Sequence, residues 1–412
     1  MEQVVITGTG LISPLGNDVD TFWRRLVGGE SGISPIVSFD AARHKVRIAG
    51  AVRDFDPQAV IGSKEARRMD RFCHFALAAA EQAVREAELQ LDRIDRERMG
   101  VYVGSGIGGI QTLMQQADLS AERGPSRVSP TLVPMMIPNM AAALISIRYG
   151  ALGPSLAPVT ACSIGNTAIG EAFHAIRSGR ADVILAGGAE AALTDIALAS
   201  FANATALSAR NDEPQRASRP FDANRDGFVI AEGAGILVLE SRAHAMRRGA
   251  GILGEVIGYG ASSDAYHMVA TPPDGDGAAR AMRLALTEAG LSPDELDVIS
   301  AHATSTVVGD RSETAAIKRV LGGEAYRIPI TANKSMTGHM LGASGAVEAI
   351  ALLRSLREQC IPPTVNLDTP DPACDLDYVP NEARKAGLRY GMSNSFGFGG
   401  HNSAIVLKAS EA

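Results

Sequence analysis

The sequence of 412 residues has only four cysteines, and their spacing argues against two common structural uses of sulfur. Cys73, Cys162, Cys360 and Cys374 stand far apart and include no C-x-x-C pair. Neither a zinc knuckle nor a disulfide framework is therefore predicted, and we expect no metal site. Four free thiols fit best with a reducing compartment.

Long apolar runs are also missing. No basic leader precedes an apolar segment, and no stretch approaches about 18 uninterrupted apolar residues. We therefore expect a soluble, cytoplasmic protein without membrane insertion. Positive charge is scarce as well, because 39 Lys and Arg residues face 46 Asp and Glu residues. The net charge of −7 argues against a general affinity for nucleic acid.

Apolar residues and glycine are plentiful. Hydrophobic residues make up 46% of the chain, which is enough for a large core, and 43 glycines predict many tight turns and close backbone contacts. The length suits two domains or a doubled fold better than one small core.

The segment from Pro158 to Gly170 organises the rest of the chain, because it reads as a strand end, a tight turn and a helix start. The turn carries Cys162 between small neighbours. A thiol at a helix N-terminus is close to unpaired N–H groups, which favour the thiolate and hence nucleophilic attack. The alternative is that Cys162 is a small buried residue without reactivity.

Strands and helices alternate along the whole chain, and the pattern at 255–260 echoes that at 5–10. This predicts a duplicated α/β unit with an N-terminal half over residues 1–250 and a C-terminal half over residues 251–412. The expected helices cover residues 21–26, 64–87, 139–149, 168–178, 243–248, 278–289, 311–320 and 344–358. The expected strands cover residues 4–10, 99–104, 181–187, 235–240, 255–260, 297–301, 327–331, 390–393 and 403–408.

Basic residues mark the start of the expected helix 64–87. Lys64, Arg67, Arg68 and Arg71 follow at spacings that place them on one side of its first two turns. This side is either a solvated charged face or a docking site for an acidic partner.

A glycine pattern follows the strand at 99–104. Gly104, Gly106 and Gly109 match G-x-G-x-x-G, which suggests a dinucleotide site when it opens a helix. No acidic residue ends a second strand about 20 residues later, so a nucleotide site is disfavoured. The polar, proline-marked residues 120–138 are expected to form a surface excursion.

Two histidines also follow predicted strands. His302 stands at a strand end before several hydroxyl residues, and Lys334 and His339 occupy a turn that leads to a helix. Functional sites collect at such strand ends in α/β proteins. The glycine-rich residues 393–402, which include Phe396, could cradle a phosphate, supply an oxyanion hole or gate an apolar ligand.

Four motifs taken together resemble those of the β-ketoacyl-acyl carrier protein synthases, and among these the elongating enzymes of the synthase II type. The resemblance runs from about Val4 to Lys408. The motifs are Thr160-Ala-Cys-Ser-Ile-Gly165, His302-Ala-Thr-Ser-Thr306, Asn333-Lys-Ser-Met-Thr-Gly-His339 and Asn394-Ser-Phe-Gly-Phe-Gly-Gly-His-Asn402. It implies a thiolase-like fold of two similar α/β halves with a five-layered α-β-α-β-α core, and a homodimer.

The resemblance also implies a decarboxylative condensation in fatty-acid elongation. Cys162 would carry the acyl chain as a thioester. His302 and His339 would stabilise the enolate of the malonyl thioester, and Lys334 would set their protonation state with Asp310 or Glu348 in support. The backbone N–H groups of Cys162 and Phe396 would form the oxyanion hole.

Binding roles follow from the same resemblance. Thr304 and Thr306 would bond the phosphopantetheine arm, which arrives on the acyl carrier protein, so no resident cofactor is expected. The carrier protein is acidic, which gives the basic residues a use. The docking residues would be Lys64, Arg67, Arg68 and Arg127. The acyl pocket would include Ile107, Leu132, Ala192, Phe201 and Leu341.

Related activities are less well supported by the residues. A degradative thiolase would carry a second active-site cysteine, and the segments around Cys360 and Cys374 do not match that motif. A ketosynthase of a polyketide or specialised-lipid pathway and a non-condensing partner subunit remain alternatives. Two residues depart from the family pattern: Ala303 replaces a glycine, and Ile164 is bulkier than expected. Alanine is strained at position 303 if the backbone there requires a positive φ.

Overall fold

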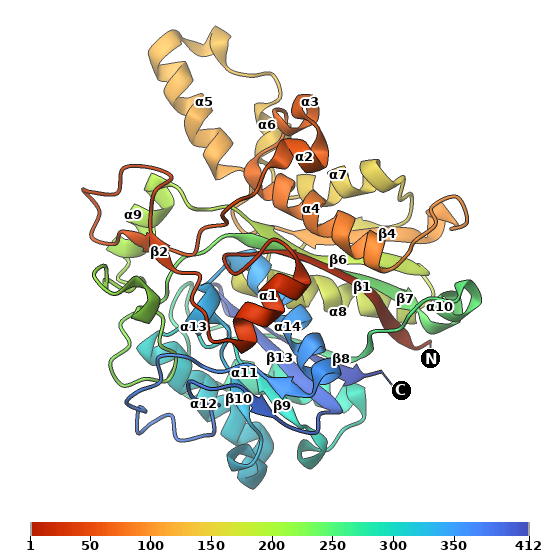
Figure 1. The fold of residues 1–412 in the computed structure, drawn as a ribbon, viewed down its shortest axis with the longest axis vertical. Helices are drawn as coiled ribbons and strands as arrows, with labels where there is room; N and C mark the ends of the chain where they lie inside the picture. The colour runs from red at the N-terminus through yellow and green to blue at the C-terminus, as the bar shows by residue number, and fades with distance from the viewer. Residues whose placement is uncertain (1, 411–412) are drawn as a thin grey trace.

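The computed structural model describes residues 2–410 and is built around a sheet of ten strands (Figure 1). Their order is β10-β9-β13-β14-β8-β1-β7-β6-β4-β5. The ten strands are β1 (Val4–Ile12), β4 (Met99–Gly104), β5 (Ser155–Leu156), β6 (Val183–Glu190), β7 (Gly233–Ser241), β8 (Gly254–Ser263), β9 (Val298–Ser300), β10 (Ile330–Thr331), β13 (Tyr390–Gly397) and β14 (His401–Ala409). Two small sheets pair β2 (Ser34–Pro35) with β3 (Ile48–Ala49) and β11 (Cys360–Ile361) with β12 (Arg384–Lys385).

The large sheet consists of two halves with the same topology. In the first half β5, β4 and β6 run parallel, and β7 and β1 follow in antiparallel pairing. In the second half β10, β9 and β13 run parallel, and β14 and β8 follow in the same way. The halves meet where β1 pairs with β8 over three residues. This matching order confirms the predicted thiolase-like fold of two similar units.

Fourteen α-helices accompany the strands within residues 2–410. They are α1 (Val19–Val27), α2 (Pro57–Ile61), α3 (Ser63–Ala66), α4 (Arg71–Glu86), α5 (Ile110–Arg123), α6 (Leu132–Met136), α7 (Met140–Tyr149), α8 (Ile164–Arg177), α9 (Asp195–Asn203), α10 (Arg242–Arg248), α11 (Asp276–Ala289), α12 (Val307–Leu321), α13 (Lys334–Thr337) and α14 (Ser344–Glu358). None of the helices in this described part of the chain is long and apolar enough to cross a membrane.

Three layers of helices alternate with the two half-sheets, as Figure 1 shows from top to bottom. Helices α4 and α7 cover the outer face of the first half-sheet, and α11 and α12 cover that of the second. Helices α8 and α14 lie between the half-sheets, where their apolar residues form the largest core cluster. Because α8 and α14 face strands on both sides, they are apolar around most of their surface. The core is therefore the expected five-layered one.

The predicted single helix over residues 64–87 is wrong in its first turns. The chain forms the short helix α3, turns, and starts again at α4. Asp70 causes the restart, because its carboxylate caps α4 by accepting from the Phe72 N–H and also accepts from the backbone and hydroxyl of Thr112. The basic residues before Asp70 therefore do not share a helix face with Arg71.

Two other expectations need adjustment. The proline-marked excursion is partly helical, since α5 runs to Arg123 and α6 lies inside it, and together they project from one end of the molecule (Figure 1). Strand β13 continues through Phe396 to Gly397, so the glycine-rich loop is confined to residues 398–400. Phe396 therefore sits on a strand, fixed by its pairing with β14.

Candidate active site

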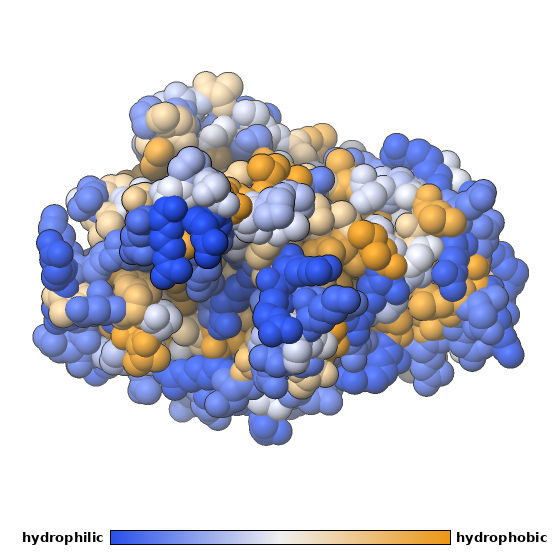
Figure 2. All heavy atoms as spheres, turned by 90° about the horizontal axis from the view of Figure 1, so that it is seen from above, coloured by the Kyte–Doolittle hydropathy of each residue, from blue (hydrophilic) through white to orange (hydrophobic). Residues whose placement is uncertain are grey.

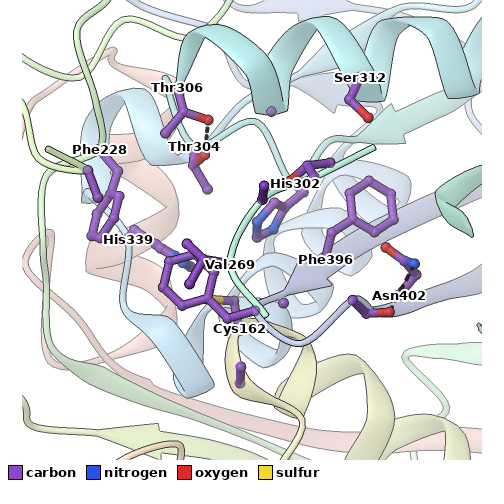
Figure 3. A pocket seen from close by; sticks show the side chains of 18 of the residues that line it. Cys162, Phe228, Val269, His302, Thr304, Thr306, Ser312, His339, Phe396 and Asn402 are labelled. Carbon is purple, nitrogen blue, oxygen red and sulfur yellow. Dashed lines mark hydrogen bonds between the residues drawn. The ribbon is translucent and has the colours of Figure 1, made fainter. Parts of the chain in front are cut away.

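A cavity of about 360 Å³ opens beside Cys162 and collects the predicted reactive residues. Its lining includes Cys162, His302, His339, Thr304 and Thr306. Figure 3 shows these side chains converging from separate segments of the chain. The structure therefore brings the cysteine and both histidine segments to one place, as their positions at strand ends predict.

Cys162 lies in a 3₁₀ turn at Ala161–Ser163 that runs directly into α8. Burial raises the pKa of its thiol to about 12, although the charge of Lys334 and nearby backbone N–H groups oppose that rise. The backbone N–H groups thus act in the predicted direction, but the loss of hydration outweighs them. The nucleophile rests as a thiol and must pass on its proton when it reacts.

The backbone groups at the sulfur differ from the predicted pair. The N–H groups that favour the charged sulfur belong to Cys162 and Phe398. Phe396 lies two residues earlier on β13, and its ring packs against His302 with 5.6 Å between ring centroids. The backbone N–H beside the sulfur therefore comes from Phe398, in the loop after β13, and not from Phe396 as predicted.

His302 and His339 face each other edge to face, with ring centroids 5.5 Å apart. Burial lowers the pKa of both imidazoles well below the usual value, and the positive charge of Lys334 lowers them further. Both rings are thus neutral at physiological pH. Nδ1 of His339 lies 3.0 Å from the Ser344 hydroxyl, which can donate to it and leave the proton on Nε2.

Lys334 stands behind the histidines and is fully buried. Its Nζ bonds Oε1 of Glu348 at 2.5 Å. Burial raises the pKa of Glu348 to about 7, against the opposing charge of Lys334. Of the two predicted supporting acids, Glu348 thus contacts Lys334 directly, whereas Asp310 forms a separate ion pair with Arg225 at 3.0 Å.

The segment from His302 to Thr306 is held in a strained shape. Ala303 adopts a φ of 31° and Ser305 a φ of 70°, so the strain predicted for an alanine at position 303 is present. Glu313 of α12 binds this segment by accepting from the N–H groups of His302 and Ala303 at 2.9 and 2.7 Å. The hydroxyls of Thr304 and Thr306 lie 3.1 Å apart at the cavity wall (Figure 3).

The predicted acyl-pocket residues divide into three groups. Ile107, Phe201 and Leu341 line the cavity. Ala192 lies behind this wall, in the apolar cluster that contains Cys162 and Leu341. Leu132 does not belong to the cavity lining within the described chain, because α6 forms part of the projecting excursion. The assignment of Leu132 to this pocket is therefore wrong for a single chain.

The predicted docking residues are exposed at the end of the molecule that carries α3 and α5. Lys64 lies on α3, Arg67 and Arg68 follow it, and Arg127 ends the 3₁₀ turn after α5. Figure 2 looks down on this end and shows hydrophilic side chains interrupted by apolar patches. In contrast, Arg71 pairs with Glu232 at 2.8 Å.

Sequence reasoning missed Phe398 and Glu190. Phe398 belongs to the glycine-rich motif from Asn394 to Asn402, but the sequence prediction gave its role to Phe396 in the same motif. Glu190 ends β6 beside the cavity, and its carboxylate occupies the G-x-G-x-x-G turn. The signal that could have indicated Glu190 is an acidic residue that follows the expected buried strand at 181–187. Within residues 2–410, no group of three or more His, Cys, Asp or Glu side chains is arranged to hold a metal ion.

The doubled fold and a cysteine facing two neutral histidines define a thiolase-like condensing enzyme, an acyltransferase. Comparisons with known proteins give the family. The family model "Beta-ketoacyl synthase, N-terminal domain" matches residues 1–245, and "Beta-ketoacyl synthase, C-terminal domain" matches residues 253–368. The chain therefore belongs to the β-ketoacyl synthases.

Full-length relatives support the synthase II type. The chain is 49% identical to the 3-oxoacyl-[acyl-carrier-protein] synthase 2 of Synechocystis sp., over 99% of this chain and 98% of the relative. It is 48% identical to the enzyme of that name from Staphylococcus aureus, over 100% of this chain and 99% of the relative.

Solved structures agree. A β-ketoacyl synthase from Burkholderia phymatum matches with a TM-score of 0.93 and 37% identity, over 100% of both chains. A type II polyketide ketosynthase, solved in complex with its acyl carrier protein, matches with a TM-score of 0.92 and 38% identity, again over 100% of both chains.

Proposed function

We propose that this protein elongates fatty acids by condensing an acyl-enzyme thioester with malonyl-acyl carrier protein, which yields β-ketoacyl-acyl carrier protein and CO2. The observation that carries the proposal is the convergence of Cys162, His302 and His339 on one cavity, with Lys334 behind them. The curated relatives named 3-oxoacyl-[acyl-carrier-protein] synthase 2 favour fatty-acid elongation over polyketide synthesis.

The first step transfers the acyl chain. Sγ of Cys162 attacks the acyl thioester carbonyl of the carrier protein, a C–S bond forms to the enzyme, and the C–S bond to pantetheine breaks. The thiol proton leaves with the pantetheine sulfur. The N–H groups of Cys162 and Phe398 stabilise the tetrahedral oxyanion in this water-poor site.

The second step makes the carbon nucleophile. His302 and His339 are neutral and can donate hydrogen bonds to the malonyl thioester carbonyl. When the bond to the carboxylate carbon breaks, CO2 leaves and the electron pair enters the enolate that both rings hold. The enolate carbon then attacks the acyl-Cys162 carbonyl and the new C–C bond forms. The C–S bond to the enzyme breaks, and the cysteine leaves as a thiolate that takes up a proton from solvent.

The partner in this proposal is an acyl carrier protein. The exposed side chains of Lys64, Arg67, Arg68 and Arg127 offer positive charge that an acidic carrier would meet. The pantetheine arm would pass Thr304 and Thr306 on its way to Cys162. The reaction takes no resident cofactor, since this arm comes with the carrier. The four free cysteines suit a cytoplasmic location.

We also propose that the active form is a homodimer built on β5. In the described chain β5 is the last strand of the large sheet, so one of its sides is open for pairing. Apolar side chains on and near this edge are exposed. They are Ile147, Leu152, Leu156 and Val159, with exposed fractions of 75%, 70%, 42% and 55%. A second copy adding its own β5 would extend the sheet and cover them.

The test is intact-protein mass after incubation with acyl carrier proteins, followed by malonyl-carrier protein. Wild type should gain the acyl mass and then lose it as β-ketoacyl product forms. Cys162→Ala should gain no mass, whereas Cys360→Ala, a matched change at another buried cysteine, should behave as wild type. A wild type that loads no acyl chain would overturn the proposal and favour a non-condensing subunit.

A further inference from the structure

The glycine turn after β4 encloses a carboxylate of the same chain. Oε1 of Glu190 accepts from the Ser105 hydroxyl at 2.8 Å and from the Ile107 N–H at 3.1 Å. Oε2 accepts from the N–H groups of Gly106 and Gly342 at 2.9 and 3.1 Å. Two donors thus reach each oxygen, so the hydrogen-bonding capacity of the carboxylate is filled.

This contact depends on glycine on both sides. A Cβ at Gly106 would lie 2.8 Å from Oε2 of Glu190, and a Cβ at Gly342 would lie 2.9 Å from it. Either side chain would push the backbone away from the carboxylate. The two glycines therefore bring the turn after β4, in the first half of the chain, and the turn after His339, in the second half, onto one side chain.

Glu190 is fully buried, yet it lines a cavity whose other walls are mainly apolar. Burial raises the pKa of its carboxyl, which the four donors oppose. A polar group is costly in such a wall unless hydrogen bonds compensate it. The proposed reaction does not use Glu190 for proton transfer or charge stabilisation, so its presence in the wall needs another reason.

The backbone segments that Glu190 holds carry the walls of the cavity. Ile107 donates its own N–H to the carboxylate, and Leu341 directly precedes Gly342. Both side chains line the cavity and pack in the same apolar cluster as Cys162. The position of the carboxylate therefore fixes how far apart these two walls stand beside the nucleophile.

We propose that Glu190 is a positioning residue that ties the segments of the Ile107 and Leu341 walls to one carboxylate and thereby sets the longest acyl chain that Cys162 accepts. This inference rests on the proposed function. Without the carboxylate, the two segments lose their common acceptor and the walls can move away from each other. Long acyl chains would lose apolar contact first, and short chains would still reach Cys162.

The test compares Glu190→Gln with wild type in acyl loading of Cys162, using carrier protein charged with a six-carbon or a sixteen-carbon chain. Glutamine keeps the volume, but its NH2 group faces N–H donors and cannot accept from them. We expect six-carbon loading within about threefold of wild type and sixteen-carbon loading at least about tenfold slower. A tenfold loss in the rate of sixteen-carbon loading corresponds to the burial free energy of about two methylene groups that no longer contact the cavity walls.

Two further variants make the result specific. Ser105→Ala removes one of the four donors and should shift the same ratio by a smaller factor, even if Glu190→Gln fails to fold. Glu240→Gln makes the same chemical change at a buried carboxylate on β7 that bonds Thr7, His244 and Arg248. It should leave the ratio of the two loading rates as in wild type.

Equal slowing of both chain lengths in Glu190→Gln, or no change in either, would overturn the inference. So would an unchanged ratio in Ser105→Ala if that is the only soluble variant. In these cases wild type still loads acyl chains, so the proposed function survives. If wild type loads no chain of either length, the proposed function fails and this inference fails with it.

Discussion

At the scale of single residues, Lys334 influences every reacting group of the site. Its charge lowers the pKa of His302, His339 and the Cys162 thiol, while its ammonium group is held by Glu348. A nearby positive charge disfavours protonation of an imidazole and favours a thiolate, so this lysine adds to the effect of burial on the histidines and opposes the effect of burial on the cysteine.

Replacing Lys334 with methionine should therefore change the pH dependence of malonyl decarboxylation. Without the charge, the histidine pKa values rise. The imidazoles then protonate at a higher pH than in wild type, and the variant loses decarboxylation activity at that pH. We expect the acid limb of the pH–rate profile to move to higher pH. Lys318→Met, at a surface ion pair with Asp375, is the control and should leave the limb in place. An unmoved limb in Lys334→Met would contradict this role.

Ala303 offers a test of backbone strain. Its φ of 31° is unfavourable for alanine, and glycine removes that cost while adding flexibility to the unfolded chain. Ala303→Gly should stabilise the fold by about 0.5–1 kcal/mol in urea unfolding. Ala301→Gly, at a buried neighbour not among the residues with positive φ, should instead destabilise it by about 1 kcal/mol. Destabilisation by both changes would show that position 303 is not strained.

At the scale of elements, Asp70 determines where α4 begins and ties it to α5 through Thr112. Asp70→Ala removes an N-cap and leaves two buried donors on Thr112 without their acceptor. We expect a loss of about 2–4 kcal/mol in the free energy of unfolding. Asp56→Ala, at the exposed cap of α2, is the control and should cost about 0.5–1 kcal/mol. Similar losses in both variants would mean that Asp70 acts as an ordinary cap.

The same residue shows what the sequence could and could not predict. The apolar spacing of residues 72–84 correctly predicted a helix, because local periodicity decides that much. The interruption at Asp70 depends on a partner 42 positions away in the chain, Thr112, which no local pattern contains. Likewise, motif order predicted the segments that meet at Cys162, but the choice of Phe398 over Phe396 depends on where β13 ends.

At the scale of the whole molecule, the repeat of strand and helix patterns was enough to predict two similar halves. Their joining into one sheet through β1 and β8 was not predicted, since it requires three backbone pairs between distant segments. The division of the chain near residue 250 stays a prediction. The open side of β5 likewise followed only from the assembled sheet, because strand length and order are properties of the fold.

The proposed dimer can be tested at that edge. Leu156→Lys combined with Val159→Lys places two charges where the second copy would pack, so the variant should elute as a monomer in size-exclusion chromatography with light scattering. Met246→Lys, at an exposed apolar residue of α10, should remain dimeric. Wild type that is monomeric at all concentrations would contradict the proposal directly.

The joining of the two half-sheets also brings β1 and β14, the first and last strands of the described chain, close together. Gly254 at the start of β8 pairs with Ile6 of β1 on one side and with Ala409 of β14 on the other. Strands β1 and β14 thus flank β8 and lie about 10 Å apart. A short linker could close the chain there, and new ends could be opened between α10 and β8. The resulting circular permutant would be translated with the histidine half first and the cysteine half second, and would still assemble the same site.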